Sequence, residues 1–524
     1  MKALCVLYGG RLEPEAFEKV LLAGEGRESA FSKALAAVRD FPGVQKIIFF
    51  GEEGKAYHQL PPEAEQILKP SWTLKSLMEE LSIVSAGYEL TYFAWADCPL
   101  LDPALAGALA ERHLRYRAEY SYADGWPYGF APELLAPGTA GILAKIAAGS
   151  DGPVERDALF HLIQKDINAF DIETEISPVD LRPFRLNLAA DSKRNLLLLS
   201  RLMEAGLSSA SDADKLIAEK PELLRTLPAF FNIQVTGACP QTCSFCPWPA
   251  CGGDITERKD FLPKAAFGEL LDKIEKFAGD AVIDISLWGE PSLHPERLEL
   301  IEMVLSRSAL SLVVETSGIG WKEDELKALA IAASGAAPRK NKMAPLSWIV
   351  SLDAHDPERY REVRGPGFSE ARACAKTLLS LFPKAAYVQA LRVKGFEDDI
   401  EHFYRFWKEE GSAAGLKDTA HIIIQKYDDF AGALPKMQAS DLSPIKRRQC
   451  WHVQRDVCVL LDGRVPRCRE DLNALKGNGD VLGNVFSDDL EHIWKKGAAL
   501  FTEHCKAEYN GICASCDEYY TYNF

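Results

Sequence analysis

The sequence predicts an α/β protein with two segments of alternating strands and helices, followed by a short cysteine-rich tail. Strand-like and helix-like patterns alternate up to residue 191 and again from residue 230 to about residue 425. Ten of the 13 cysteines fall in two groups, at 239–251 and 450–516, which favours bound metal over scattered core thiols. The length of 524 residues allows about three domains.

Residues 1–191 are the first predicted domain, of α/β type. Apolar β-prone runs and helical periodicity alternate along it. The predicted strands are Lys2–Tyr8, Gln45–Phe50 and Tyr88–Ala96, and the predicted helices include Leu74–Leu81 and Ala104–Arg117. A charge-rich helical linker is predicted over residues 192–228, with a turn and helix cap at 208–213.

Residues 229–440 are predicted to form a partial barrel of six strand-helix units. The strands are Phe231–Val235, Ala281–Leu287, Leu310–Glu315, Trp348–Leu352, Ala386–Leu391 and His421–Gln425. Such repeats form a parallel sheet, whose chemistry collects at the carboxyl ends of the strands. Residues 441–524 are the last predicted domain, which is too short to own a large core, so metal would have to help hold it together.

The bulk composition is that of an acidic globular protein. With 47% hydrophobic and 26% charged residues, the chain can bury a sizeable core. The net charge of -16 argues against nucleic acid or an anionic membrane as the main partner. The apolar run at residues 1–10 is too short for a signal peptide, and no stretch approaches the roughly 18 apolar residues of a spanning helix. We therefore expect a cytoplasmic protein.

Cys239, Cys243 and Cys246 follow directly on the first strand of the barrel segment. Three thiolates on one tight loop can hold three irons of a 4Fe-4S cube and leave the fourth open to a substrate or cofactor. A structural zinc loop is the alternative, but zinc takes four ligands and no histidine lies nearby. A disulfide is disfavoured by the odd number of close thiols. The run predicts an iron-sulfur site.

This run, with Phe245 before its last cysteine, resembles the signature of radical S-adenosylmethionine (radical SAM) enzymes. The resemblance implies SAM as a second cofactor, its reductive cleavage to a 5'-deoxyadenosyl radical, and a reductant such as flavodoxin or ferredoxin. The run Leu287-Trp-Gly-Glu-Pro resembles the GGE motif of that family, with Trp288 in place of the first glycine. It implies that Gly289 and Glu290 receive the methionine part of SAM, although a simple strand-to-helix turn would look the same.

Polar residues end the next strands and are candidates for the same cofactor pocket. Both strand ends resemble family sequences that meet the ribose and carboxylate of SAM. The residues implied are Glu315, Thr316, Ser351 and Asp353. Helix caps or an Asx turn would explain each of them singly. Arg392, near the end of the fifth strand, could pair with the cofactor carboxylate or be a solvated arginine. No Ser-His-Asp arrangement or paired catalytic carboxylates can be identified, so the catalytic residues are not predicted.

The tail resembles the SPASM extension that accompanies many radical SAM enzymes. It contains a cysteine, a hairpin turn at Gly463, a second cysteine and a late CxxC. The resemblance implies one auxiliary 4Fe-4S cluster whose ligands are Cys450, Cys468, Cys513 and Cys516. A zinc site made by the same four thiolates is the alternative.

Two further cysteines of the tail have no assigned role. Cys458 lies in an apolar strand pattern that favours a core thiol, and Cys505 could replace Cys450 as a ligand. These cysteines are too few and too poorly spaced for two auxiliary clusters, so we expect one. A fully ligated cluster would accept an electron without binding the substrate, which predicts a net oxidation such as dehydrogenation or crosslink formation.

The first domain weakly resembles nucleotide-sugar cytidylyltransferases. The run Trp95-Ala-Asp-Cys-Pro is similar to the segment that places an aspartate on the catalytic magnesium, which implies that role for Asp97, although an Asx turn is the alternative. The basic glycine loop of the family is reduced to Gly9-Gly10-Arg11, and the second aspartate is replaced by Ala189, with Asp191 two residues away. We therefore expect the fold with poor nucleotidyl transfer.

The whole arrangement is similar to radical SAM/SPASM proteins of the spiro-SPASM type. That similarity implies a radical SAM enzyme that oxidatively modifies a substrate such as a peptide, a protein side chain or a carbohydrate-like group. The second candidate function is a cytidylyltransferase whose iron-sulfur domains are structural or carry electrons.

Overall fold

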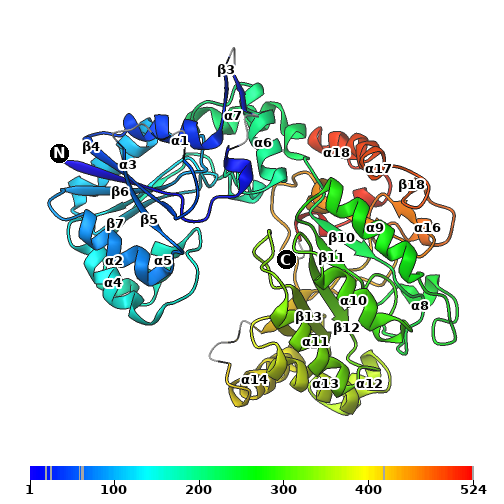
Figure 1. The fold of residues 1–524 in the computed structure, drawn as a ribbon. Coiled ribbons are helices and arrows are strands. Elements are labelled where there is room, and N and C mark those ends of the chain that lie inside the picture. Colours follow the sequence, from blue (N-terminus) through cyan, green and yellow to red (C-terminus); the bar gives the residue numbers. More distant parts are fainter. Residues whose placement is uncertain are drawn as a thin grey trace. The chain divides into compact units, whose positions relative to one another are not determined.

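The computed structural model describes residues 1–17, 21–23, 26–57, 60, 64–416, 419 and 421–521. The chain divides into two compact units, Met1–Leu223 and Leu224–Phe524 (Figure 1). The finer division into four parts predicted from the sequence remains a prediction. Among the described residues, no helix is long and apolar enough to cross a membrane.

The first unit contains a seven-stranded mixed sheet in the order β5-β4-β1-β6-β8-β7-β9. Its strands are β1 Ala3–Tyr8, β4 Val44–Glu52, β5 Glu65–Lys69, β6 Leu90–Trp95, β7 Tyr120–Asp124, β8 Glu133–Leu135 and β9 Ile172–Ile176. Strand β1 is fully buried and runs parallel to both β4 and β6, with Tyr8 opposite Phe50 and Trp95. The segments that follow β1 and β6 therefore leave the sheet at the same edge.

Helices and a small hairpin complete the first unit. They are α1 Ala30–Arg39, α2 Leu74–Val84, α3 Pro103–Tyr116, α4 Thr139–Ile146, α5 Ala158–Gln164, α6 Lys193–Glu204, α7 Ala213–Glu219 and the strand pair β2 Leu21–Ala23 and β3 Gly26–Glu28. Asp102 caps α3 by accepting from the backbone of Ala104 and Leu105, and its second oxygen accepts from Ala210 at 2.7 Å. That bond ties the predicted linker to the first unit.

The second unit contains a seven-stranded parallel sheet in the order β15-β14-β13-β12-β11-β10-β16. Its strands are β10 Phe230–Ile233, β11 Val282–Asp284, β12 Ser311–Thr316, β13 Leu346–Ser351, β14 Ala386–Arg392, β15 Ile422–Lys426 and β16 Asp456–Val459. The first six are the strands expected from the sequence, within a few residues at each end. The prediction of a parallel, barrel-like sheet is confirmed.

The seventh strand, β16, comes from the cysteine-rich tail and pairs in parallel with β10. We expected a hairpin turn at Gly463, and the amide of Leu460 donates to the carbonyl of Arg464 across that turn at 2.9 Å. Beyond the turn, strand β17 (Arg464–Pro466) pairs antiparallel with β18 (Val481–Asn484). Gly463 does make the turn, with φ of 83°. The tail and the barrel therefore share one sheet.

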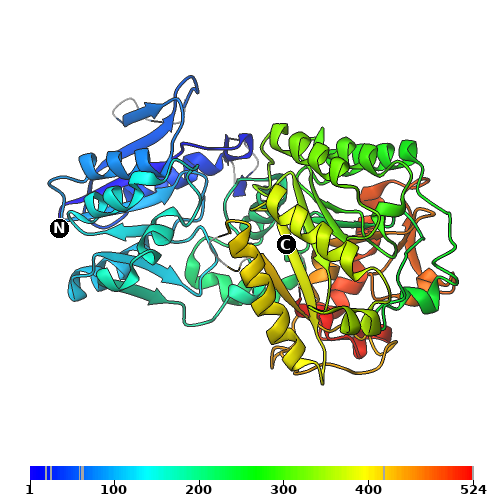
Figure 2. The ribbon, with the colours of Figure 1, turned by 90° about the horizontal axis from the view of Figure 1, so that it is seen from below.

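Helices cover the second sheet (Figure 2). They are α9 Lys264–Phe277, α10 Arg297–Leu305, α11 Glu323–Gly335, α12 Pro357–Val363, α13 Phe368–Leu381 and α14 Glu397–Ala413, with α8 Trp248–Cys251, α15 Trp451–Arg455, α16 Leu472–Leu475, α17 Leu490–Lys496 and α18 Ala498–Cys505 in the connecting loop and the tail. The apolar faces of α9, α10 and α13 join the strands in one core that includes Trp348 and Trp407.

Candidate active site

The three-cysteine loop follows β10 at the carboxyl end of the second sheet. Backbone hydrogen bonds hold it from two sides, because Cys239 donates to the carbonyl of Ile255 and Ser244 donates to that of Val363, both at 3.0 Å. The amide of Gln241 donates to the hydroxyl of Tyr360 at 2.8 Å. These hydrogen bonds to neighbouring segments hold the loop in place without a bound metal.

All three cysteines of this loop line one cavity of about 250 Å³. Burial raises the pKa of Cys239 and of Cys246 to about 12, and it also raises the pKa of Cys243. Without a cation, the thiols therefore stay protonated at neutral pH. Bound metal would displace these protons, because thiolates are the ligands.

The donor set of this loop fits an iron-sulfur cube. Three thiols line one cavity, and in such a cube each thiolate binds a different iron. A structural zinc ion would need a fourth protein ligand.

Arg364 places a buried positive charge beside these thiols. Burial raises the pKa of Cys243, and the charge of Arg364 partly offsets that rise. The guanidinium donates from Nε to Gln241 at 3.0 Å and forms a second bond, from a terminal nitrogen, with Asp353. Asp353 was singled out from the sequence but Arg364 was not. The turn that ends α12 brings Arg364 and Asp353 together, and no local sequence pattern predicts this contact.

Glu290 joins two strand-end loops. It is 3% exposed, and its Oε1 accepts from the hydroxyl of Thr316 at 2.5 Å and from the backbone of Ser292 at 3.3 Å. Its Oε2 accepts from the backbone of Ser317 at 2.7 Å. Burial raises the pKa of Glu290 despite these bonds. Glu290 and Thr316 both line the cavity, but their side chains hold the loop rather than standing free.

The backbone before Glu290 is strained and tightly packed. Trp288 has a left-handed φ of 49°, which costs roughly 1–2 kcal/mol for a residue with a Cβ. Its ring packs against Phe430 at 5.4 Å and Trp248 at 6.5 Å between ring centres, which offsets that cost. A Cβ on Gly289 would lie 2.0 Å from the carbonyl oxygen of Thr236, so only glycine fits.

Glu315 and Ser351 form a polar network on the cavity wall with Gln389 of β14. The carboxylate of Glu315 accepts from the hydroxyl of Ser351 at 2.7 Å and from the amide of Gln389 at 2.8 Å. All three side chains line the cavity. Gln389 was missed by sequence reasoning, although its place on a predicted strand could have suggested it. Arg392 is exposed at the end of β14 and lies outside the cavity wall.

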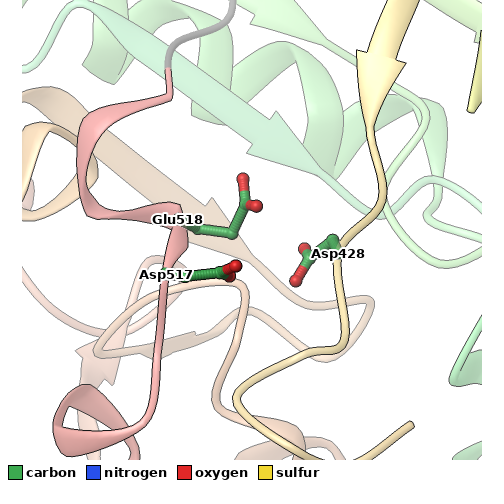
Figure 3. A group of neighbouring side chains, drawn as sticks. All are labelled: Asp428, Asp517 and Glu518. Atoms are coloured by element: carbon green, nitrogen blue, oxygen red, sulfur yellow. The ribbon is translucent and has the colours of Figure 1, made fainter. Parts of the chain in front are cut away.

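The end of β15 and the segment after Cys468 form a further part of the cavity wall. Lys426, Asp428 and Arg469 line the cavity there. Asp428 lies with Asp517 and Glu518, their oxygens within 4.8 Å (Figure 3). Lys426 pairs with Asp517 at 2.9 Å and also with Glu518, and Arg469 lies 3.4 Å from Asp428. The two cations offset part of the negative charge of this acidic group.

The four predicted auxiliary ligands lie in one region of the tail. Cys450 precedes α15, Cys468 follows β17, and Cys513 and Cys516 lie in and after a short turn. Burial raises the pKa of Cys450 to about 12, and Cys513 adds to that rise. Burial raises the pKa of Cys468 and of Cys516, and the charge of Cys450 adds to each. Cys450 therefore lies near the other three, since it acts electrostatically on Cys468 and Cys516 and Cys513 acts on it.

The remaining tail cysteines are close to this group. Cys458 is 3% exposed on β16 and packs in one apolar cluster with Leu287 and Trp288. Burial raises the pKa of Tyr509, and Cys505 and Cys450 both raise it further. Cys505 and Cys450 therefore both lie near Tyr509. The choice of Cys450 over Cys505 as a ligand therefore stays a prediction.

The chain is similar to known proteins in sequence. The profile described as the Radical SAM superfamily matches residues 233–406. An uncharacterized protein of Treponema pallidum (strain Nichols) is 35% identical over 375 residues, which cover 70% of this chain and 98% of that protein.

Solved structures resemble parts of the chain at low identity. Streptococcus suis SuiB bound to the precursor peptide SuiA is 13% identical with a TM-score of 0.40, over 70% of this chain and 82% of SuiB. A cytidylyltransferase from Leptospira borgpetersenii serovar Hardjo-bovis (strain JB197) is 14% identical with a TM-score of 0.35, over 42% of this chain and 95% of that one. Likeness at this level does not transfer the activity of either protein. Residues 233–406, which include the three-cysteine loop and strands β11 to β14 of the parallel sheet, are a domain of the radical SAM superfamily.

Proposed function

We propose that this chain is a radical SAM enzyme that carries out a net oxidation and uses an auxiliary iron-sulfur cluster as electron acceptor. The ligands of the SAM-binding cluster would be Cys239, Cys243 and Cys246, and those of the auxiliary cluster Cys450, Cys468, Cys513 and Cys516. When bound, these groups supply the cleavage of SAM to methionine and a 5'-deoxyadenosyl radical, and a place for the electron left after hydrogen abstraction.

The extent of the cavity is the observation that carries this proposal. The cavity runs from the three-cysteine loop to Arg469, which directly follows Cys468. A substrate in it would therefore lie next to the three-cysteine loop and next to the residue that follows Cys468, one of the predicted auxiliary ligands.

The residues of the chain would orient the cofactor and move a proton. The carboxylate of Glu315 is exposed to the cavity and can accept hydrogen bonds from ribose or substrate hydroxyl groups. Asp284 also lines the cavity, and burial raises the pKa of Asp284 to about 7. At neutral pH its carboxylate can therefore take the proton that an oxidised hydroxyl or amine releases.

Counting iron and identifying a product would test this proposal. Anaerobic reconstitution should give about eight irons per chain, since two cubes are expected. Redox titration followed by EPR should then show two signals, of which one changes when SAM is added. Screening of peptide and carbohydrate libraries should yield a product lighter than its substrate by two hydrogen atoms. About four irons with one signal would contradict the auxiliary cluster, and a product of unchanged mass would contradict the net oxidation.

The second candidate, a cytidylyltransferase, depends on Asp97. Both carboxylate oxygens of Asp97 accept hydrogen bonds from Arg156. Because both oxygens are engaged by an arginine, this arrangement favours radical SAM chemistry over nucleotidyl transfer as the function of the chain.

A further inference from the structure

The first unit has a cluster of charged groups of its own at the carboxyl end of β6. Asp97 follows that strand and its side chain is 1% exposed. Arg156 donates from its two terminal nitrogens to the two oxygens of Asp97, at 2.8 and 2.6 Å. This paired geometry is the strongest that an arginine and a carboxylate form.

The same guanidinium reaches a second carboxylate. It donates to Oδ2 of Asp191 at 3.0 Å, and Oδ1 of Asp191 accepts from the amide of Asn195 at 2.8 Å. The guanidinium carbon lies 4.5 Å from the centre of the Trp95 ring, which packs against one of its faces. Two aspartates from distant segments thus converge on one partly buried cation, and that cation is the Arg156 side chain.

The glycine loop beside this cluster is filled by aromatic rings. A Cβ on Gly9 would lie 2.5 Å from the ring of Phe49, and one on Gly10 would lie 2.4 Å from that of Trp72. Trp72 stacks on Phe50 with 4.8 Å between ring centres and donates to the carbonyl of Gly51 at 2.8 Å. Close packing of aromatic side chains therefore explains the two glycines without any approach of a phosphate.

A magnesium ion does not fit these residues. Magnesium requires oxygen ligands at about 2.0–2.1 Å in octahedral geometry and usually keeps several waters. The oxygens of Asp97 already accept from Arg156. A guanidinium cannot lose its proton to make room, and its charge repels a divalent cation.

We infer that Arg156 takes the place of the divalent cation, so that the first unit keeps a cytidylyltransferase-like fold without metal-dependent nucleotidyl transfer. Arg156 supplies the positive charge that holds Asp97 and Asp191 together. A nucleoside triphosphate would meet these carboxylates with no metal between them. This role does not depend on the radical chemistry of the second unit.

Manganese binding to the full-length chain, followed by EPR of free Mn²⁺, tests the inference. Wild type and Asp97→Asn should bind the same amount of Mn²⁺, because wild type should have no manganese site that depends on Asp97. Arg156→Ala should gain one site per chain, with affinity at least ~10-fold above wild type once the guanidinium charge is gone, and Arg156→Ala/Asp97→Asn should lose it. The matched control is Arg182→Ala, because Arg182 joins Asp124 and Asp180 in the same unit but is 60% exposed. It should gain no site.

Three results would overturn the inference: an Asp97-dependent manganese site in wild type, no gain in a folded Arg156→Ala chain, or an equal gain in Arg182→Ala. Arg156→Gln is a second variant in case alanine leaves the chain unfolded. Millimolar Mn²⁺ should raise the thermal midpoint of Arg156→Gln and leave that of wild type unchanged. Equal shifts in both proteins would also contradict the role of Arg156.

Discussion

Arg364 and Asp353 form a buried ion pair that connects the end of α12 to the loop after β13. The same guanidinium donates to Gln241 at 3.0 Å, within the three-cysteine loop. The other oxygen of Asp353 accepts from the backbone of Leu391 at 2.7 Å. One arginine therefore couples the cysteine loop to two further strand ends of the barrel.

Arg364→Gln should destabilise the second unit. The substitution leaves the Asp353 carboxylate buried without its cation, which costs about 3–5 kcal/mol for a broken buried pair. The matched control is Arg359→Gln, because Arg359 pairs with the more exposed Asp399 and Glu362 and should lose less than about 1 kcal/mol. Denaturant midpoints and iron content measure the effect. Equal losses in both variants would contradict this role of the pair.

Gly289→Ala should abolish SAM cleavage while the fold survives. The new Cβ would lie 2.0 Å from the carbonyl oxygen of Thr236, so the loop that carries Glu290 must move. Gly335→Ala is the control, since nothing lies within 4 Å of a Cβ at that position. 5'-Deoxyadenosine formation under dithionite measures both variants. Normal formation by Gly289→Ala would show that this loop does not position the cofactor.

The double variant Cys513→Ala/Cys516→Ala should keep SAM cleavage and lose one cluster. Iron should fall from about eight to about four per chain, because one cube has lost two thiolates. Cys374→Ala is the control, since Cys374 is a buried core thiol on α13. Unchanged iron, or zinc in place of iron in the parent protein, would argue against the auxiliary cluster.

His113 should make the stability of the first unit depend on pH. Burial lowers the pKa of His113 to about 4, and its Nδ1 bonds the hydroxyl of Ser121 at 2.8 Å. As the pH falls, His113 is therefore protonated near pH 6.5 in the unfolded chain but only near pH 4 in the folded chain. Stability is complete above pH 6.5 and falls below it, by about 2 kcal/mol at pH 5.

The matched variant for this effect is His113→Asn, which keeps a polar group near Ser121 and removes the titration. Its denaturant midpoint should change less between pH 8 and pH 5 than that of wild type. His161→Asn is the control, because His161 is 56% exposed. The same loss between these pH values in wild type and in His113→Asn would refute the assignment.

The fold was predictable where a local pattern decides the structure. Apolar runs located the six barrel strands, and the CxxxCxxC spacing located the loop that lines the cavity. The pairing of β16 with β10 was not predictable, because a short apolar strand does not encode its distant partner.

The site was predicted in part for the same reason. Glu315, Ser351 and Asp353 stand at strand ends, and strand ends can be read from the sequence. Arg364 and Gln389 meet them only through tertiary contacts. Arg392 was chosen for its nearness to a strand end, but it lies exposed.

Cleavage of SAM by the reduced protein tests the central claim most directly. Wild type reconstituted anaerobically with iron and sulfide, then given dithionite and SAM, should release 5'-deoxyadenosine, and Cys243→Ala should release none. Cys251→Ala, which changes a nearby cysteine outside the cavity wall, should release it like wild type. Fully loaded wild type that releases no 5'-deoxyadenosine, or equal release by Cys243→Ala, would contradict the account.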